Sequence, residues 1–363
     1  MKAKSVRRKT LQAGREKRAA RSAPARQTVK TVNLALQGGG AHGAFAWGVL
    51  DRLLEDRRIA FEGISASSAG AMNAVVLAHG LAVGGPKGAR EALADFWRGI
   101  SESGRFSLLQ PSPFDRLVHN HSLESSPAFL AFDLVTRLLS PYQFNPLNYN
   151  PLREVLERTV DFERLRREDC VKLFLCATNV CTGKVKVFEN AEVTADSVLA
   201  SACLPHIFQA VEIDGERYWD GGYMGNPALF PLIYNCGSAD IVIVHINPIQ
   251  RCEAPRTAAE ILNRVNEISF NSSLMREMRA IAFVTKLIEE GKLEPGAAKR
   301  MLIHAIDGEE FMRELTVSSK FNTDWEFLTH LRDVGRDSAD QWIAANFDRL
   351  NVETTVDIRA KYL

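Results

Sequence analysis

The segment from Asn33 to Phe45 constrains the fold of this chain more than any other. An apolar run, Val32–Leu36, leads into Gly38-Gly-Gly-Ala-His-Gly43, and a helical pattern follows at once. A strand that turns through glycines into a helix presents free backbone N–H groups at the helix start, where an anion or a developing oxyanion can be held. The pattern therefore predicts a strand-turn-helix unit with an anion site.

A second turn of the same kind, Gly63-Ile-Ser-Ala-Ser-Ser-Ala-Gly70, follows about thirty residues later. The spacing around Ser68 is that of G-x-S-x-G, with Ala66 in the place of the first glycine. Small neighbours such as Ala66 and Gly70 suit a nucleophile on a strained strand-to-helix turn. A serine in this position is also a common helix N-cap, but acyl transfer would explain both turns together.

A serine nucleophile needs a base. In Tyr218-Trp-Asp220-Gly-Gly-Tyr223 an acid ends a predicted strand and is followed by Gly221 and Gly222. This arrangement places a carboxylate at a tight turn beside a sheet. A plain Asp-Gly hairpin turn remains the alternative interpretation.

The rest of the chain alternates between predicted strands and helices from Thr31 onward, as expected of a layered α/β sheet with helices on both faces. Two apolar runs, which begin at Leu173 and Ile241, are typical of central parallel strands covered on both sides. Further strands are predicted at Ile59–Ser65, Val171–Thr178, Lys184–Glu189, Arg217–Trp219 and Ile241–Ile246. Helices are predicted at Ala44–Glu55, Ala69–His79 and Ala89–Ile100, with a glycine-rich break at Gly80–Gly88.

We divide the chain into a basic tail (1–30), a catalytic domain (31–250) and a mainly helical C-terminal region (251–363) packed on that domain. An insert at about 103–150 encloses an apolar helix, Ala128–Leu139, which is either a packing insertion or a lid over an acyl-chain groove. In the C-terminal region an apolar stripe at helical spacing predicts a core-facing helix. The stripe consists of Ile261, Val265, Ile268, Leu274, Met278 and Ile281.

Charge is concentrated in the tail. The whole chain has a net charge of +1, but residues 1–30 contain eleven Lys or Arg and one acid, Glu16, which predicts a disordered segment. We expect this tail to be a solvated arm or a tether to a lipid surface rather than a nucleic-acid binder; an organelle transit peptide is another interpretation.

Cysteine usage and hydropathy indicate a cytoplasmic protein that can be peripheral to a membrane. The six cysteines show no metal-ligand spacing, and Cys170, Cys176 and Cys203 are predicted to be buried thiols in a reducing compartment. No run reaches the eighteen apolar residues of a membrane helix. The sequence does not indicate the oligomeric state.

A dinucleotide site is a rival interpretation of the first turn. The loop Gly38–Gly43 also fits G-x-G-x-x-G after a strand, and Glu62 follows about twenty residues later, where an acid can bind a ribose. This interpretation leaves the second turn unexplained.

Four motifs together resemble the patatin-like phospholipase family over roughly Val32 to Pro231. They are Gly38–Gly43, the turn around Ser68, Ser201-Ala-Cys-Leu-Pro205, and Asp220-Gly221-Gly222. The resemblance implies a three-layer α/β fold with a mainly parallel central sheet, helices on both faces and a helical C-terminal extension.

The resemblance also implies a Ser-Asp dyad without histidine, metal or cofactor. Ser68 would be the nucleophile and Asp220 its base, with an oxyanion hole formed by the N–H groups of Gly38, Gly39 and Gly40. The supporting motif positions are Gly43, Ala66, Gly70, Gly221 and Gly222. Two residues depart from the family pattern: Ala66 replaces a glycine, and His42 stands where the family usually has Arg or Lys, which leaves the head-group charge preference open.

The resulting hypothesis is a serine acyl hydrolase that cleaves carboxylic esters of lipids through an acyl-Ser68 intermediate. Phospholipids, lysophospholipids and acylglycerols all fit. The alternatives are a lipid-binding or regulatory protein with weak turnover, the dinucleotide enzyme, and a Ser-Asp-His triad completed by His245.

Overall fold

The computed structural model describes residues 29–105, 122–124 and 126–363. One eight-stranded sheet forms its centre, in the order β5-β6-β3-β2-β1-β7-β8, with β4 paired to β3 outside this path. The parallel strands are β1 (Lys30–Leu36), β2 (Ile59–Ala66), β3 (Lys172–Asn179), β7 (Asp240–His245) and β8 (Leu302–Asp307). The strands β4 (Val185–Glu189), β5 (Val211–Ile213) and β6 (Glu216–Asp220) form the antiparallel end.

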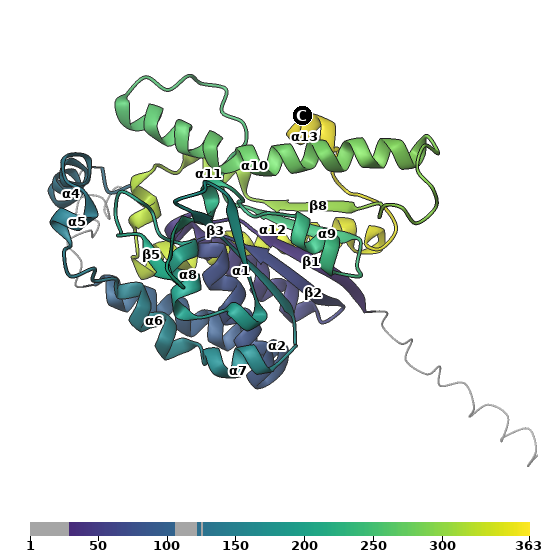
Figure 1. Ribbon diagram of the computed structural model, residues 1–363, viewed down its shortest axis with the longest axis horizontal. Coiled ribbons are helices and arrows are strands. Elements are labelled where there is room, and N and C mark those ends of the chain that lie inside the picture. Colours follow the sequence, from purple (N-terminus) through teal and green to yellow (C-terminus); the bar gives the residue numbers. More distant parts are fainter. Residues whose placement is uncertain (1–28, 106–121, 125) are drawn as a thin grey trace, which may run out of the picture.

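Helices cover both faces of the sheet, as Figure 1 shows. One layer includes α1 (Gly43–Asp56), α2 (Ala69–Gly104), α6 (Pro151–Thr159), α7 (Phe162–Arg167), α8 (Ala195–Ser201) and α12 (Trp325–Asn346). The other includes α9 (Phe230–Asn235), α10 (Ala258–Glu289) and α13 (Ile358–Tyr362). The smaller helices are α4 (Pro127–Leu138), α5 (Pro141–Phe144) and α11 (Glu309–Glu314).

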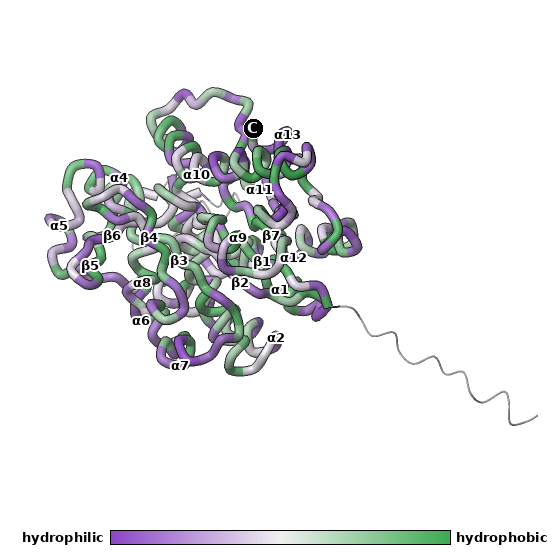
Figure 2. The backbone as a smooth tube through the Cα atoms, turned by 45° about the vertical axis from the view of Figure 1, so that its right-hand side comes forward, coloured by the Kyte–Doolittle hydropathy of each residue, from purple (hydrophilic) through white to green (hydrophobic). Residues whose placement is uncertain are grey.

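The alternation of side chains along the central strands fills both layers. On β1, Leu34 and Leu36 belong to the larger core cluster, whereas Ala35 faces the smaller one. On β7, Val242 and Ile243 divide in the same way. Figure 2 shows the buried strand β3 as a hydrophobic trace and the surface helix α7 as a hydrophilic one. The predicted α/β fold with helices on both faces is confirmed.

Most predicted elements are present, with small shifts at their ends. The glycine-rich break is confirmed but narrower than expected: α2 runs from Ala69 to Gly104, and only Gly84 and Gly85 have non-helical backbone angles. Two strands were not predicted. β5 has only three residues. In β8 the apolar run is interrupted by His304, a buried residue whose Nε2 is 3.0 Å from Asp240 Oδ1.

The prediction for the α10 stripe is half wrong. Leu274, Met278 and Ile281 are buried in the smaller core cluster, as expected. The first half of the helix leaves this core, so its apolar side chains face solvent. Ile261 is 48% exposed, Val265 52% and Ile268 54%. The helical spacing of the apolar residues is correct, but only the second half of the helix packs on the core.

Two other predictions meet a mixed outcome. Cys176 and Cys203 are buried, but Cys170 is exposed because it lies in the turn before β3. The predicted apolar helix of the insert is present as α4, and it buries none of its residues. It contacts the rest of the protein through Phe129 and Phe132, whose rings approach Phe321. Whether α4 is a lid stays a prediction.

The basic tail lies outside the described residues except for its last two positions, and so does part of the insert. The proposed division into a tail, a catalytic domain and a C-terminal region stays a prediction. Within the part of the chain that the structure describes, no helix is both long and apolar enough to cross a bilayer.

Candidate active site

The register of the two central strands brings the predicted turns together. In the parallel pair β1 and β2, Leu36 lies opposite Ala66, so the glycine loop and Ser68 leave the sheet at the same edge. They are in direct contact: a Cβ on Gly38 would lie 2.5 Å from the Cβ of Ser68. The structure thus joins the two motifs that the sequence showed separately.

Ser68 has the backbone conformation of a nucleophile on a sharp turn. It directly precedes α2, and its φ of 56° and ψ of −126° are strained for a residue with a side chain. Its side chain makes no cap hydrogen bond to the helix. Its backbone N–H donates to the Ser201 hydroxyl at 3.0 Å. The N-cap interpretation therefore does not account for this serine.

Asp220 is held at the same edge by the antiparallel end of the sheet. It is the last residue of β6 and lies opposite Ala177 of β3. Its backbone N–H donates to the Cys203 carbonyl at 2.8 Å. The side chain is fully buried, and Oδ1 accepts a hydrogen bond from the Gly222 N–H at 2.7 Å. The other oxygen, Oδ2, has no partner among the described residues.

Burial raises the pKa of the Asp220 carboxyl to about 6, and the Gly222 N–H, the Ser68 hydroxyl and Lys320 each act in the opposite direction. The Ser68 hydroxyl is thus near the carboxylate, although the two side chains do not form a hydrogen bond of normal geometry. Catalytic hydrogen bonds are often long in free enzymes and shorten when substrate binds. A carboxylate with this pKa and a free oxygen beside a serine is equipped to act as a general base.

Gly39 and Gly40 of the glycine loop line the same space as Ser68 and Asp220. The Gly38 N–H is already used, because it donates to Asn226 Oδ1 at 2.7 Å. For Gly39 and Gly40, no hydrogen bond from the backbone N–H to another described residue is found. Gly40 has a φ of 60°, which a residue with a side chain rarely adopts. Of the three expected oxyanion donors, Gly39 and Gly40 are therefore the two that remain free.

Several polar residues that the sequence did not single out hold this loop in place. The Gln37 side-chain oxygen accepts from the N–H groups of Ile246 and Asn247, at 2.9 and 3.0 Å. The Asn247 amide donates to the Gly38 carbonyl at 2.7 Å. Gln37 and Asn247 each follow a predicted strand, which is the only sequence signal of their role; Asn226 has none.

The remaining motif positions allow close packing around the two turns. A Cβ on Gly43 would lie 2.7 Å from the Ala69 Cβ, and one on Gly70 would lie 2.4 Å from the Leu36 carbonyl oxygen. At Gly221 a Cβ would lie 2.0 Å from the Cys176 carbonyl oxygen. Ala66 is fully buried. Gly43, Gly70 and Gly221 therefore need a small residue for a packing reason, and at Gly222 a Cβ would lie 3.0 Å from Asp220 Oδ1.

A cavity of about 120 Å³ opens between the glycine loop, Ser68 and Asp220. Its lining includes Ser68, Asp220 and the two free loop glycines. The other residues that line it are Leu204, Tyr223, Asn263, Asn266, Phe270, Val317, Lys320 and Phe321. Most of these come from the C-terminal region, and no histidine is among these lining residues.

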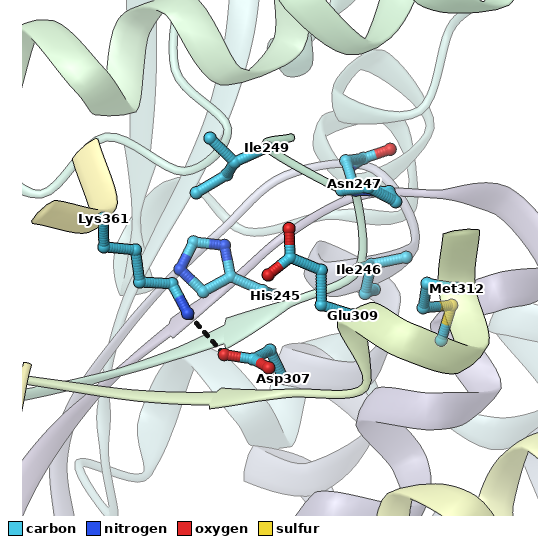
Figure 3. A pocket seen from close by; sticks show the side chains of 9 residues that line it. His245, Ile246, Asn247, Ile249, Asp307, Glu309, Met312 and Lys361 are labelled. Atoms are coloured by element: carbon cyan, nitrogen blue, oxygen red, sulfur yellow. Dashed lines mark hydrogen bonds and ion pairs between the residues drawn. The ribbon is translucent and has the colours of Figure 1, made fainter. Parts of the chain in front are cut away.

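His245 lies elsewhere. Figure 3 shows its ring in a separate small cavity beside Asp307 and Lys361. Its Nε2 is 2.6 Å from the Tyr362 hydroxyl, and burial, assisted by Lys361, lowers its pKa to about 3. This environment fits a neutral structural histidine and does not favour a Ser-Asp-His triad.

His42 does not reach the cavity either. Its ring is buried against Phe327, and Nε2 is 2.7 Å from the Ser319 hydroxyl. Burial and the nearby Lys320 lower its pKa well below the usual value, so the ring is neutral at pH 7.

The dinucleotide interpretation also lacks its acid. The Glu62 carboxylate accepts hydrogen bonds from the N–H groups of Gly237 and Ser238, at 2.7 and 2.8 Å. Glu62 follows Phe61 on β2, and Phe61 pairs with Val32 of β1. This part of the sheet lies several residues before the glycine loop, so Glu62 is not beside the loop. Within the described ranges, no group of three or more His, Cys, Asp or Glu residues is arranged to hold a metal ion.

Comparison with known proteins identifies the class. A family model for patatin-like phospholipase matches residues 34–233, more than half of the chain, so the chain belongs to the patatin-like phospholipase family. Family membership supports a lipid hydrolase activity. No curated protein matches the chain.

Solved structures that match the chain include VipD from Legionella pneumophila, at 17% identity and a TM-score of 0.41, over 86% of this chain and 67% of VipD. The type III effector ExoU is 16% identical with a TM-score of 0.32, over 90% of this chain and 54% of ExoU. The matched chain in the ExoU-SpcU complex from Pseudomonas aeruginosa is 15% identical, with a TM-score of 0.31. The match covers 90% of this chain and 53% of the matched chain. The chain thus spans about half the length of ExoU.

The contact between Gly38 and Ser68 gives a testable prediction. In Gly38→Ala, the added methyl group would overlap Ser68 Cβ and displace either the serine or the loop. We expect labelling of Ser68 by a fluorophosphonate to slow by at least about 100-fold, the loss typical of a disrupted oxyanion site. Gly84→Ala is the matched control, because a Cβ there meets nothing within 4 Å. Labelling of Gly38→Ala at the wild-type rate would contradict this account.

Proposed function

We propose that this protein is a serine acyl hydrolase that cleaves carboxylic ester bonds of lipids with Ser68 as nucleophile and Asp220 as general base. The observation that supports this most strongly is the joining of three features in one cavity. A strained serine, a buried carboxylate with a free oxygen and two free loop N–H groups line the same space. The family match supports the lipid class of the substrate.

In the proposed reaction, Asp220 Oδ2 takes the hydroxyl proton of Ser68 as Oγ bonds to the ester carbonyl carbon. The carbonyl π pair moves to its oxygen, which the N–H groups of Gly39 and Gly40 bind. Collapse of this tetrahedral intermediate breaks the bond to the alcohol, which leaves with the proton from Asp220. Water then attacks the acyl-Ser68 ester by the same steps, again with Asp220 as base, and releases a carboxylic acid.

The dyad is tested by covalent labelling. A lipophilic fluorophosphonate should add to wild-type protein once, as measured by intact mass, and should not add to Ser68→Ala. Asp220→Asn should react at least about 100-fold more slowly, because the amide cannot accept the serine proton. Ser67→Ala is the control, since this buried neighbour bonds the Gly225 carbonyl instead of lining the cavity. A well-folded wild type without an adduct would favour the alternative of a lipid-binding or regulatory protein.

The raised pKa of Asp220 sets the expected pH dependence. The base must be ionised to accept a proton, so kcat/KM should fall as pH drops through about 6 and should level off above it. An unperturbed aspartate would place this limb near pH 4. The profile should be measured with an uncharged short-chain ester, so that the substrate itself does not titrate. An acid limb at pH 4 would contradict the assignment of the buried carboxylate as the base.

We also propose that the exposed apolar face of α10 contacts the lipid surface that holds the substrate. The face is formed by Ile261, Leu262, Val265 and Ile268. Asn263, Asn266 and Phe270 of the same helical segment line the catalytic cavity from the opposite side of the helix, so the exposed face is the outer surface of one cavity wall. The helix α4, which exposes Leu134 and Leu138, also adjoins the cavity through Phe321. Apolar side chains on the outer wall of a cavity can enter a lipid layer and bring the cavity close to an ester held there.

Replacing Ile261 and Val265 together by Ser tests this contact. Activity on vesicles of zwitterionic and anionic phospholipids should fall about tenfold, because two apolar side chains no longer enter the lipid. Activity on a monomeric short-chain ester should be unchanged. Val352→Ser, an exposed valine away from both helices, is the control. An equal loss on both substrates would refute lipid contact, and a smaller particle in gel filtration would show that the face binds a second copy instead.

A further inference from the structure

Lys320 is the residue of the cavity that neither the motifs nor the proposed dyad chemistry explains. It lies in the 3-10 helix η4 (Ser318–Phe321), far in sequence from the catalytic motifs. Its backbone packs on the glycine loop, since a Cβ on Gly40 would lie 2.6 Å from the Lys320 carbonyl oxygen. The residue is partly open to the cavity, but its ammonium group is deep enough that burial lowers its pKa.

The ammonium group has no ion-pair partner within 4 Å among the described residues. It donates one hydrogen bond, to the side-chain oxygen of Asn247 at 3.3 Å. The carboxylate of Glu267 attracts it from a distance, but that carboxylate is bound by Arg251 and Arg264, so it does not neutralise the lysine. A buried charge without a direct counter-ion is costly, which makes its position beside the dyad informative.

The charges of Lys320 and Asp220 influence each other. The lysine lowers the pKa of Asp220, and the aspartate raises that of Lys320. During the attack, negative charge leaves the carboxylate, which takes up the serine proton, and appears on the ester oxygen beside the glycine loop. A fixed cation near both places stabilises the charge before and after this transfer, with no need for solvent to reorganise.

Lys320 is also connected to the loop through Asn247. The Asn247 side chain accepts from the lysine and donates to the Gly38 carbonyl at 2.7 Å. This carbonyl belongs to the peptide group whose N–H is that of Gly39. A donor on the oxygen of a peptide polarises its N–H, and the cation behind Asn247 strengthens that effect.

We propose that Lys320 is a positioning residue for acyl transfer: acting through Asn247, it orients and polarises the Gly38–Gly39 peptide, and its charge stabilises the oxyanion. The proposal rests on the proposed function and extends it to a residue outside the matched family segment.

The test compares Lys320→Met with Lys320→Arg on an uncharged short-chain ester. In Lys320→Met, kcat should fall by at least about tenfold while KM changes little, because the lost interaction acts on the transition state. Lys320→Arg keeps the charge and should recover part of kcat. Lys299→Met is the matched control: this half-buried lysine bonds only backbone carbonyls, those of Ile233 and Cys236, and is not among the residues that line the cavity. Melting temperatures of all variants separate lost chemistry from lost folding.

The pH profile supplies a readout that a purely structural lysine would not move. Without the cation, the acid limb of kcat/KM should shift to higher pH, because Lys320 lowers the pKa of Asp220. The other titratable groups facing Asp220 are the Cys203 thiol and the Tyr223 hydroxyl. Burial raises the pKa of each to about 12, so both stay neutral across this range.

A double-mutant cycle with Asn247→Ala tests the connection. If the lysine acts through Asn247, the double variant Lys320→Met/Asn247→Ala should lose less kcat than the two single variants predict together. The comparison is made between the increases in activation free energy. An unchanged kcat and acid limb in Lys320→Met, or fully additive losses, would overturn the proposal. These outcomes are distinct from failure of the proposed function, in which wild-type protein itself would neither label at Ser68 nor hydrolyse the ester.

Discussion

The parallel pairing of β1 with β2 is the constraint on which the candidate site depends. Leu36 and Ala66 lie opposite each other, so two strand-to-helix turns emerge side by side at one edge of the sheet. The loop then approaches Ser68 so closely that only glycine fits at position 38. A shift of either strand by one residue would turn the side chains of that strand to the other layer and move the two turns out of line. The cores on both faces therefore hold the geometry of the site.

The carboxylate of Asp220 is positioned by a different set of contacts. Asp220 lies on an antiparallel strand, and its position is fixed by pairing with β3 and by the backbone of the segment after α8. The end of α8 and the residues after it contact both Ser68 and Asp220, since Ser201 accepts from the Ser68 N–H and Cys203 accepts from the Asp220 N–H. The same packing removes the carboxylate from water, so position and basicity have one cause.

The sequence predicted the parts of the site that follow from local patterns. Ser68 lies between a strand and a helix, Asp220 ends a strand, and small residues follow both, so their turns can be recognised without any tertiary information. The polar frame of Gln37, Asn226 and Asn247 could not be predicted, because hydrogen bonds between residues about 200 positions apart leave no spacing signal. The α10 stripe shows the opposite limit: helical spacing identifies an apolar face but not what covers it.

The cavity also shows where members of one family can differ. The family match ends at residue 233 and contains Ser68 and Asp220, the proposed nucleophile and base. Asn263, Phe270, Lys320 and Phe321 line the same cavity from beyond that boundary. The proposed catalytic groups and the walls around them thus come from separate parts of the chain, and η4 packs directly on the glycine loop. Substitutions in the C-terminal region can then change the shape and charge of the cavity without moving the two turns, because the register of β1 and β2 holds those turns independently.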